Sequence, residues 1–144
     1  MTGRFRAAAV VRVFLRFAIA AILLATGAGK LADVPGFAGV LATYEAFPEW
    51  ALVPVAVAVP VAELLLSAWL FSGRRLAAAA LASAGMHFLY AGWAAVTLAR
   101  GVDVPNCGCF GVFLGRPLSY GTVLEDAGLA GASLLLALVS RNVA

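Results

Sequence analysis

The sequence predicts an all-α fold, an integral membrane four-helix bundle with a short interfacial helix in its first long loop. Of the 144 residues, 64% are hydrophobic and 12% are charged, and the mean hydropathy is +1.01. Soluble domains are about 45–50% apolar and about 25% charged. Because one membrane crossing needs about 20 apolar residues, the chain has room for four crossings in a single membrane domain, residues 1–144.

The first crossing is predicted at about residues 8–28, where a basic N-terminal segment leads into an apolar run. Such a start is also typical of a cleaved signal peptide. Two features favour an uncleaved helix instead. Arg12 and Arg16 lie one helical turn apart within the run, and Gly29-Lys30-Leu31 is a poor cleavage site.

Residues 30–50 are too polar to span a membrane and are predicted to form the short interfacial helix. Asp33 is a suitable N-cap and Pro35 suits the first helical turn. Apolar side chains then recur at helical spacing, at Phe37, Val40, Leu41 and Tyr44. This pattern predicts an apolar face lying on the membrane surface. Tyr44 and Trp50 are expected to act as anchors at the level of the lipid headgroups.

The remaining crossings are predicted at about residues 51–72, 76–99 and 122–140. Pro54 and Pro60 fall inside the first of these three, and a bundle tolerates them if neighbouring groups satisfy the freed carbonyls. The last crossing has two candidate starts. Thr122 with Glu125 resembles a capping box, and Ser119 is a competing cap.

Seven of the ten lysines and arginines lie in the N-terminal segment, in the turn at residues 74–75 and at the C-terminus. Because positive charge marks the cytoplasmic side, both termini of this multi-pass chain are predicted in the cytoplasm. The loop at residues 100–121 then faces the periplasm across a bacterial inner membrane, where disulfides persist. The basic residues do not gather on one face, which argues against nucleic-acid binding.

Both cysteines lie in that loop, within the stretch Asn106-Cys107-Gly108-Cys109-Phe110-Gly111. Gly108 allows the chain to bend so that the two sulfurs can meet. A ring that small is strained, and strained disulfides are labile and oxidising. Arg100 or Arg116 could stabilise a thiolate if either lies nearby. The motif therefore predicts a redox-active dithiol, with Cys107 and Cys109 as the catalytic residues.

Two other interpretations of the cysteine pair remain. A structural disulfide between residues two apart closes almost no loop, so it would remove little chain entropy. Two thiolates could instead hold Cu(I) or contribute to a zinc site. A zinc site lacks further ligands, because His87 is the only histidine and falls inside the predicted crossing at 76–99. No metal site is therefore assigned.

Polar residues inside the predicted crossings form a second group of candidates. Glu63 is expected in hydrocarbon, where a carboxylate must be neutral, paired or beside a cavity. Its candidate partners are Arg16 and Lys30, and its role is either a proton acceptor for thiol oxidation or a structural pin between two helices. Three residues of the crossing at 76–99 are candidates for contact with a quinone: His87, Tyr90 and Trp93. Otherwise they simply pack in the bundle.

Several stretches of the chain share the pattern of one known family. They are Arg16, Thr26-Gly27-Ala28-Gly29-Lys30-Leu31, Phe37, Tyr44, Pro60-Val61-Ala62-Glu63 and Cys107-Gly108-Cys109-Phe110-Gly111. Together they resemble the MauE/DoxX-like membrane proteins, a family associated with methylamine metabolism and thiol–disulfide traffic. The resemblance implies a four-helix membrane bundle, a role in disulfide formation in exported proteins, and a periplasmic thioredoxin-like partner. The chain departs from the family at Leu124-Glu125-Asp126, where a basic residue is expected beside the acid.

These observations predict a membrane thiol–disulfide oxidoreductase whose cysteine pair exchanges disulfides with a thioredoxin-like partner. A single pair cannot relay electrons across the membrane, so a second scheme adds a quinone that reoxidises the pair. The alternatives are a non-catalytic membrane docking subunit and a protein that binds and delivers Cu(I). The sequence leaves open the direction of electron flow, the attacking cysteine and the oligomeric state.

Overall fold

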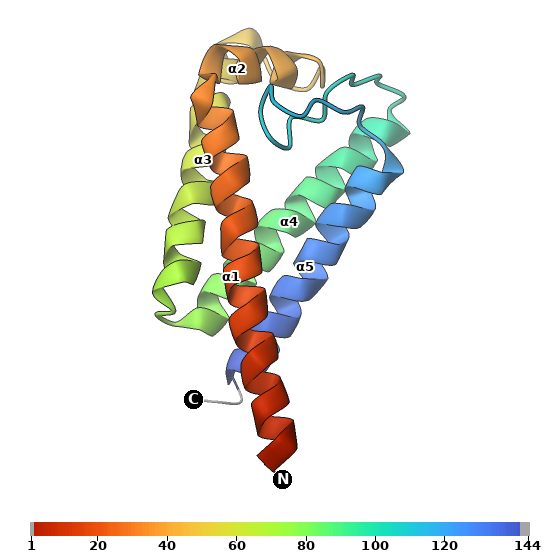
Figure 1. The fold of residues 1–144 in the computed structure, drawn as a ribbon. Helices are drawn as coiled ribbons and strands as arrows, with labels where there is room; N and C mark the ends of the chain where they lie inside the picture. The colour runs from red at the N-terminus through yellow and green to blue at the C-terminus, as the bar shows by residue number, and fades with distance from the viewer. Residues whose placement is uncertain (1, 142–144) are drawn as a thin grey trace.

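The computed structural model describes residues 2–141 and consists of helices joined by turns and loops (Figure 1). The helices are α1 (Thr2–Ala32), α2 (Val34–Ala42), α3 (Glu49–Ser72), α4 (Leu76–Ala99) and α5 (Tyr120–Arg141). All except α2 are long and apolar enough to cross a membrane, α1 over Arg6–Ala32. The predicted all-α membrane bundle with a short helix in its first long loop is confirmed.

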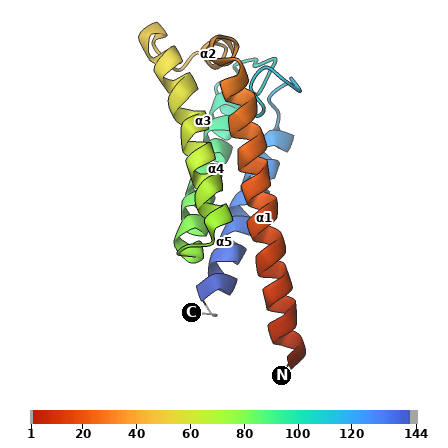
Figure 2. The same cartoon turned by 60° about the vertical axis from the view of Figure 1, so that its left-hand side comes forward.

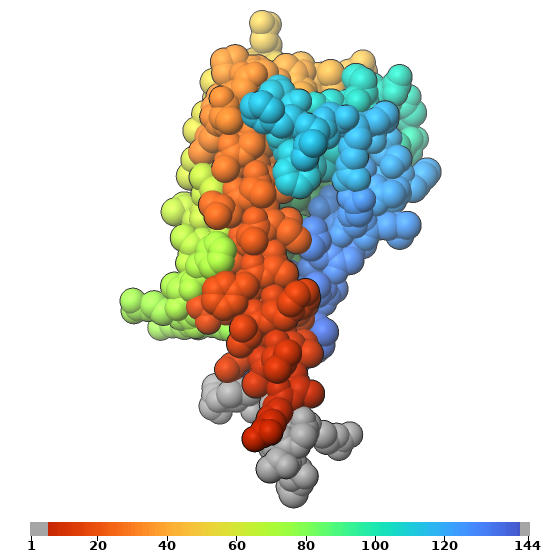
Figure 3. Space-filling view, in the orientation of Figure 1, coloured from red at the N-terminus to blue at the C-terminus, as the bar shows by residue number. Residues whose placement is uncertain are grey.

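The bundle is built from two helix pairs. Helix α1 runs along α3 and α4 runs along α5, and the pairs meet where α1 touches α5 and α3 touches α4 (Figures 1 and 2). The N-terminal end of α1, the α3–α4 turn and the C-terminal end of α5 lie at one end of the bundle. Helix α2 and the loop at residues 100–119, here called the cysteine loop, close the other end (Figure 3).

Small side chains let the helices approach closely. The buried face of α4 consists largely of Ala79, Ala80, Ser83, Ala84, Ala91 and Ala94. Larger side chains fill the centre of the core, among them Ile19, Leu23, Leu70 and Leu136. Small residues at the contacts and large apolar residues facing outward are typical of membrane bundles. Phe88 and Leu89 illustrate the outward surface, with 72% and 70% of their area exposed.

Helix α2 begins as the sequence predicts. The Asp33 side chain caps it by accepting a hydrogen bond from Gly36 N at 2.9 Å, and Pro35 lies in its first turn. Tyr44, however, is only 5% exposed, so its assignment as an interfacial anchor is wrong. The cysteine loop covers its ring. Trp50 remains 80% exposed.

The start of α5 settles the choice between the two candidate caps. The helix begins at Tyr120, and the Ser119 carbonyl accepts a hydrogen bond from Thr122 N at 3.0 Å. Ser119 therefore holds the cap position and the capping box at Thr122 is wrong. The Thr122 hydroxyl is buried without a partner among residues 2–141, and Glu125 pairs with an arginine instead.

Candidate functional site

The cysteine loop is closed by hydrogen bonds across its neck. Cys107 N donates to the Arg116 carbonyl at 2.8 Å, and Leu118 N donates to the Val104 carbonyl at 3.0 Å. These bonds join the segment at residues 104–107 to the segment at residues 116–118. The tip of the loop is therefore held as a defined turn.

Within the turn, Asn106 organises the backbone around the cysteines. Its Oδ1 accepts a hydrogen bond from Gly108 N at 2.9 Å, and its Nδ2 donates to the Gly111 carbonyl at 3.3 Å. Gly108 has φ +73°, the left-handed conformation that favours glycine. The resulting bend places Cys107 Sγ 2.7 Å from Cys109 Sγ. Both are free thiols, and a disulfide of about 2.05 Å requires only a small further approach.

Glycines let the loop lie directly on the rest of the protein. A Cβ on Gly108 would come within 2.9 Å of Val40 Cγ1 on α2. A Cβ on Gly111 would lie 2.6 Å from the Gly29 carbonyl oxygen, and one on Gly29 would lie 2.8 Å from the Phe110 oxygen. The backbone of α1 at Gly29 and the backbone of the cysteine loop at Phe110 and Gly111 are thus in direct contact.

The two thiols have different acidities. A hydrogen bond from the Cys109 thiol lowers the pKa of Cys107 to about 6, burial opposes this effect, and Arg116 adds to the lowering. The pKa of Cys109 is raised, first by its hydrogen bond to Cys107 and then by burial. The reduced pair therefore carries one thiolate at neutral pH, on Cys107. Cys107 is also the more buried of the two residues.

Only one of the two arginines considered from sequence lies beside the thiols. The Arg116 guanidinium is bonded to both carboxylate oxygens of Glu125, and this pairing is the largest of the effects that raise its pKa. The two nearby thiols raise the pKa of Arg116 further. Arg100 points elsewhere, with its guanidinium donating to the Tyr44 and Glu45 carbonyls at 3.2 and 2.9 Å.

Tyr44 is a site residue that sequence reasoning missed. Its hydroxyl donates a hydrogen bond to the Cys107 carbonyl at 2.7 Å. Burial raises the pKa of Tyr44, so the hydroxyl stays protonated and keeps this donor role. An aromatic residue at the end of an interfacial helix looks like a headgroup anchor, and only the fold shows that a loop 63 residues further along the chain covers it.

The polar cluster at Glu63 lies between α1, α3 and α4. Lys30 Nζ is 2.6 Å from Glu63 Oε1, and the Tyr90 hydroxyl donates to the same oxygen at 2.8 Å. Glu63 is completely buried, and its Oε2 has no hydrogen-bond partner among residues 2–141. Of the two partners predicted for Glu63, Lys30 forms the ion pair with it. Arg16 donates instead to the Leu70 carbonyl near the C-terminal end of α3.

One cavity of about 1040 Å³ connects this cluster with the cysteine loop. Its lining includes Lys30, Glu63, Cys107, Cys109, Arg116 and Asp126. The three residues considered for quinone contact, His87, Tyr90 and Trp93, line it as well. His87 Nδ1 lies 2.9 Å from the Ser83 carbonyl, and the Trp93 ring stacks on Phe47 with 5.2 Å between centroids. The sequence-predicted residues therefore surround one space, although they come from three helices and a loop.

Within residues 2–141, no group of three or more His, Cys, Asp and Glu side chains is placed to hold one metal ion. The two thiols alone form a two-ligand set of the kind that Cu(I) accepts. His87 is separated from them by its place in α4 and its contact with Ser83. The arrangement is therefore better suited to sulfur–sulfur chemistry than to a zinc centre.

Comparison with known proteins gives a consistent result. The family model for methylamine utilisation protein MauE matches residues 7–139. Methylamine utilization protein MauE of Paracoccus denitrificans is 31% identical over 123 residues, which cover 85% of this chain and 66% of that protein. The protein of the same name from Methylorubrum extorquens is 32% identical over 128 residues, 89% of this chain and 69% of its own length. The chain thus spans about two thirds of the length of these relatives. No solved structure matches.

Proposed function

Because the chain belongs to the MauE family of methylamine utilisation proteins, we propose that it serves that process as a membrane thiol–disulfide oxidoreductase. The observation that carries the proposal is the Cys107–Cys109 pair, with its sulfurs 2.7 Å apart and one thiol acidic. In its oxidised form the pair accepts two electrons from the dithiol of a periplasmic thioredoxin-like partner. The partner leaves as a disulfide, ready to oxidise exported proteins.

The geometry supports one order of events. The partner's thiolate attacks Cys109, the more exposed sulfur, and a mixed disulfide forms as the bond between Cys109 and Cys107 breaks. Cys107 leaves as a thiolate, since a thiol of low pKa is the better leaving group. The partner's second thiolate then attacks the partner's own sulfur in the mixed disulfide. The bond from that sulfur to Cys109 breaks, and Cys109 takes a proton. Two electrons and one proton have moved from the partner to this chain, because Cys107 remains a thiolate at neutral pH.

Reoxidation requires a two-electron acceptor, and the cavity fits a quinone. Its lining is largely apolar, and it reaches from the thiols to the cluster of Lys30, Glu63 and Tyr90. A quinone held there would supply the two-electron acceptor, with one proton coming from the Cys109 thiol and the other from water. Lys30 and Tyr90 would supply hydrogen bonds, and the free Oε2 of Glu63 would receive a proton from the thiol side.

The arrangement of charge supports a bacterial inner-membrane location with both termini in the cytoplasm. Arg12, Arg75 and Arg141 line one end of the bundle, where positive charge is expected on the cytoplasmic side. The cysteine loop lies at the opposite end (Figure 1). The cysteine loop would then face the periplasm, where a thioredoxin-like partner can reach it.

Thiol trapping in intact cells tests the proposal. Cells are acid-quenched, the thiols are alkylated with a bulky membrane-impermeant maleimide, and the wild type is compared with Cys107→Ser and Cys109→Ser. We expect labelling of the wild type only after mild reduction. We also expect a mixed disulfide with another protein in Cys107→Ser, because Cys109 can still join the partner and Cys107 is no longer present to displace it.

Two results would contradict the proposal. If both thiols label at once under oxidising conditions and neither variant traps a partner, the chain is a docking subunit. If the purified wild type retains Cu(I) and both serine variants lose it, copper delivery replaces thiol exchange.

A further inference from the structure

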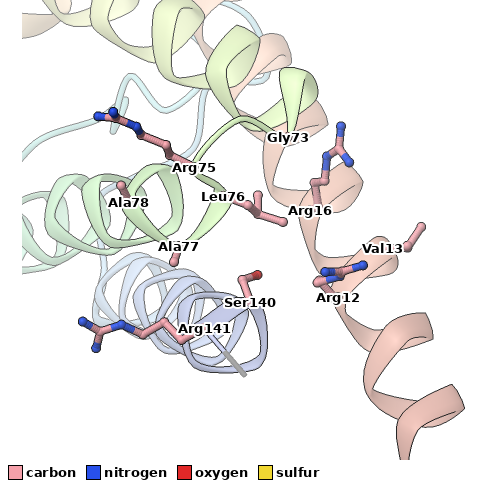
Figure 4. A pocket seen from close by; sticks show the side chains of 10 residues that line it. All are labelled: Arg12, Val13, Arg16, Gly73, Arg75, Leu76, Ala77, Ala78, Ser140 and Arg141. Atoms are coloured by element: carbon pink, nitrogen blue, oxygen red, sulfur yellow. The ribbon is translucent and has the colours of Figure 1, made fainter. Parts of the chain in front are cut away.

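A second cavity, of about 760 Å³, lies at the end of the bundle opposite the cysteine loop (Figure 4). It is bounded by α1, by the α3–α4 turn with the start of α4, and by the end of α5. Among residues 2–141, its lining contains no aspartate or glutamate but four arginines, Arg12, Arg16, Arg75 and Arg141. Four positive side chains therefore border this recess, and Figure 4 shows those of Arg75 and Arg141 extending away from Arg12.

One wall of this cavity is rigidly built. Arg16 Nε donates to the Leu70 carbonyl at 2.9 Å, and its guanidinium also donates to the Phe71 carbonyl. Gly73 adopts φ +68°, and a Cβ there would lie 2.9 Å from the Arg16 guanidinium carbon. Arg16 is thus committed to the carbonyls at the end of α3 and fixes the turn that borders the cavity.

The other three arginines are not committed in this way. Among residues 2–141, no acidic side chain forms an ion pair with Arg12, Arg75 or Arg141. Several like charges around one recess raise the local positive potential and attract an anion. Residues 2–141 thus supply the positive groups but no acidic side chain paired with them.

A buried hydroxyl lies in the same lining. Ser140 Oγ has no hydrogen-bond partner among residues 2–141, and Figure 4 shows it on the side of α5 that faces α1, across from Arg12. Buried polar atoms without a partner are rare in native proteins. An oxyanion in the cavity would accept a hydrogen bond from this hydroxyl as well as from the arginines.

The surface beside the cavity is apolar. Val13 lines the cavity and is 49% exposed, and on the same helix Val10 and Phe14 are 68% and 67% exposed. A ligand with an anionic head and an apolar tail matches both features. We propose that the cavity binds the phosphate group of an anionic phospholipid, with Arg12 and Ser140 as its donors, Arg75 and Arg141 adding positive charge at the rim, and the apolar face of α1 against its acyl chain.

The test is a titration of the full chain in detergent micelles with phosphatidylglycerol, followed by native mass spectrometry. Because each basic residue near an anionic lipid contributes about fivefold to binding, an Arg12→Gln/Arg75→Gln double variant should bind about 30-fold more weakly. Arg74→Gln is the matched control. It removes the same charge from the same turn, but Arg74 does not line the cavity, so binding should weaken clearly less than in Arg75→Gln.

Three further arms make the result decisive. Phosphatidylcholine, which is zwitterionic, should bind the wild type much more weakly than phosphatidylglycerol. Ser140→Ala should weaken phosphatidylglycerol binding without changing the fold, and the single variant Arg75→Gln covers the case in which the double variant does not fold. Equal binding of phosphatidylglycerol by the Arg75→Gln and Arg74→Gln variants would overturn the site. Binding of inorganic phosphate without binding of phosphatidylglycerol would overturn the lipid as its source.

Discussion

Cys107 and Cys109 are one residue apart in the chain, yet their surroundings give them different chemistry. Cys107 is buried, and its hydrogen bond from Cys109 and the nearby Arg116 favour the thiolate. Cys109 is more exposed and stays protonated, because a second negative charge beside the first is unfavourable. The more exposed residue of the pair is thus Cys109, and the more acidic thiol is that of Cys107.

The acidity of Cys107 can be measured directly. In the reduced protein, the rate at which iodoacetamide alkylates Cys107 should rise with pH around a midpoint of about 6, because the thiolate is the reacting form. Mass spectrometry of the Cys107 peptide gives this rate. In Cys109→Ala the midpoint should move upward, since the main stabilising hydrogen bond is lost. A wild-type midpoint near 9, the ordinary value, would contradict the assignment.

Arg116 contributes to the same acidity through its charge. Arg116→Gln should therefore raise the alkylation midpoint of Cys107, although less than Cys109→Ala does, because the guanidinium is the smaller of the two effects. Arg100→Gln is the matched control, since Arg100 is held by the Tyr44 and Glu45 carbonyls. Equal shifts in the two arginine variants would show a general charge effect and not a local one.

At the scale of elements, the contact between α1 and the cysteine loop positions the thiols. The loop backbone at Phe110 and Gly111 lies so close to Gly29 that no side chain fits between these two segments of the protein. The next residue, Lys30, binds Glu63 on α3. Two adjacent residues of α1, Gly29 and Lys30, thus contact the cysteine loop and the polar cluster. These two parts of the site are therefore fixed relative to each other.

Gly111→Ala should disturb this contact. The residue has φ +69°, and the added Cβ would meet the Gly29 oxygen at 2.6 Å. Left-handed backbone costs a non-glycine residue roughly 1–2 kcal/mol, and the collision adds to it. Thermal unfolding in detergent should show the loss of stability. Gly39→Ala on α2 meets nothing within 4 Å and should be neutral or stabilising by about 0.5–1 kcal/mol. A neutral Gly111→Ala would count against the close contact.

The pairing of α1 with α3 depends on the Lys30–Glu63 ion pair, whose side chains are 6% and 0% exposed. Glu63→Gln leaves Lys30 charged and buried, so it should destabilise the fold by about 3–5 kcal/mol. The double variant Lys30→Met/Glu63→Gln removes both charges and should recover most of that stability.

Disulfide turnover in the same double variant separates structure from chemistry. If Glu63 accepts a proton during reoxidation of the cysteines, turnover should stay low even though folding has recovered. Turnover restored together with folding would leave Glu63 as a structural pin between α1 and α3. The measurement is the fraction of oxidised Cys107–Cys109 pairs over time after a pulse of reductant.

At the scale of the whole molecule, the bundle separates two chemically different ends. The cysteine loop lies at one end (Figure 1), and the arginine-lined cavity lies at the other (Figure 4). The proposed thiol exchange would therefore face one aqueous compartment, and the proposed lipid site would face the opposite membrane surface. The orientation in the membrane decides whether the proposed exchange is feasible.

Labelling from each side of the membrane tests that orientation. In a background with both native cysteines replaced by serine, Ser119→Cys at the cysteine end and Ser72→Cys at the opposite end form a matched pair, because both serines are exposed. An impermeant maleimide should label Ser119→Cys in intact spheroplasts and Ser72→Cys only after permeabilisation. The reverse pattern would put the cysteine loop in the cytoplasm and exclude a periplasmic partner.

The sequence by itself determined the features that depend on neighbouring residues. Hydropathy marks the four long helices, Asp33 and Pro35 mark the start of α2, and a glycine between two cysteines allows their sulfurs to meet. Each follows from local chemistry, because helix spans, caps and tight turns are decided within a few residues of chain.

Only the tertiary structure decided which distant residues join the site. It brought Lys30 and not Arg16 to Glu63, and it placed Tyr44 under the Cys107 carbonyl across 63 residues of chain. Several side chains in the sequence have the right chemistry for each of these roles. The choice among them depends on helix rotation and on how closely backbones approach, and these follow from packing of the whole bundle and not from any local pattern.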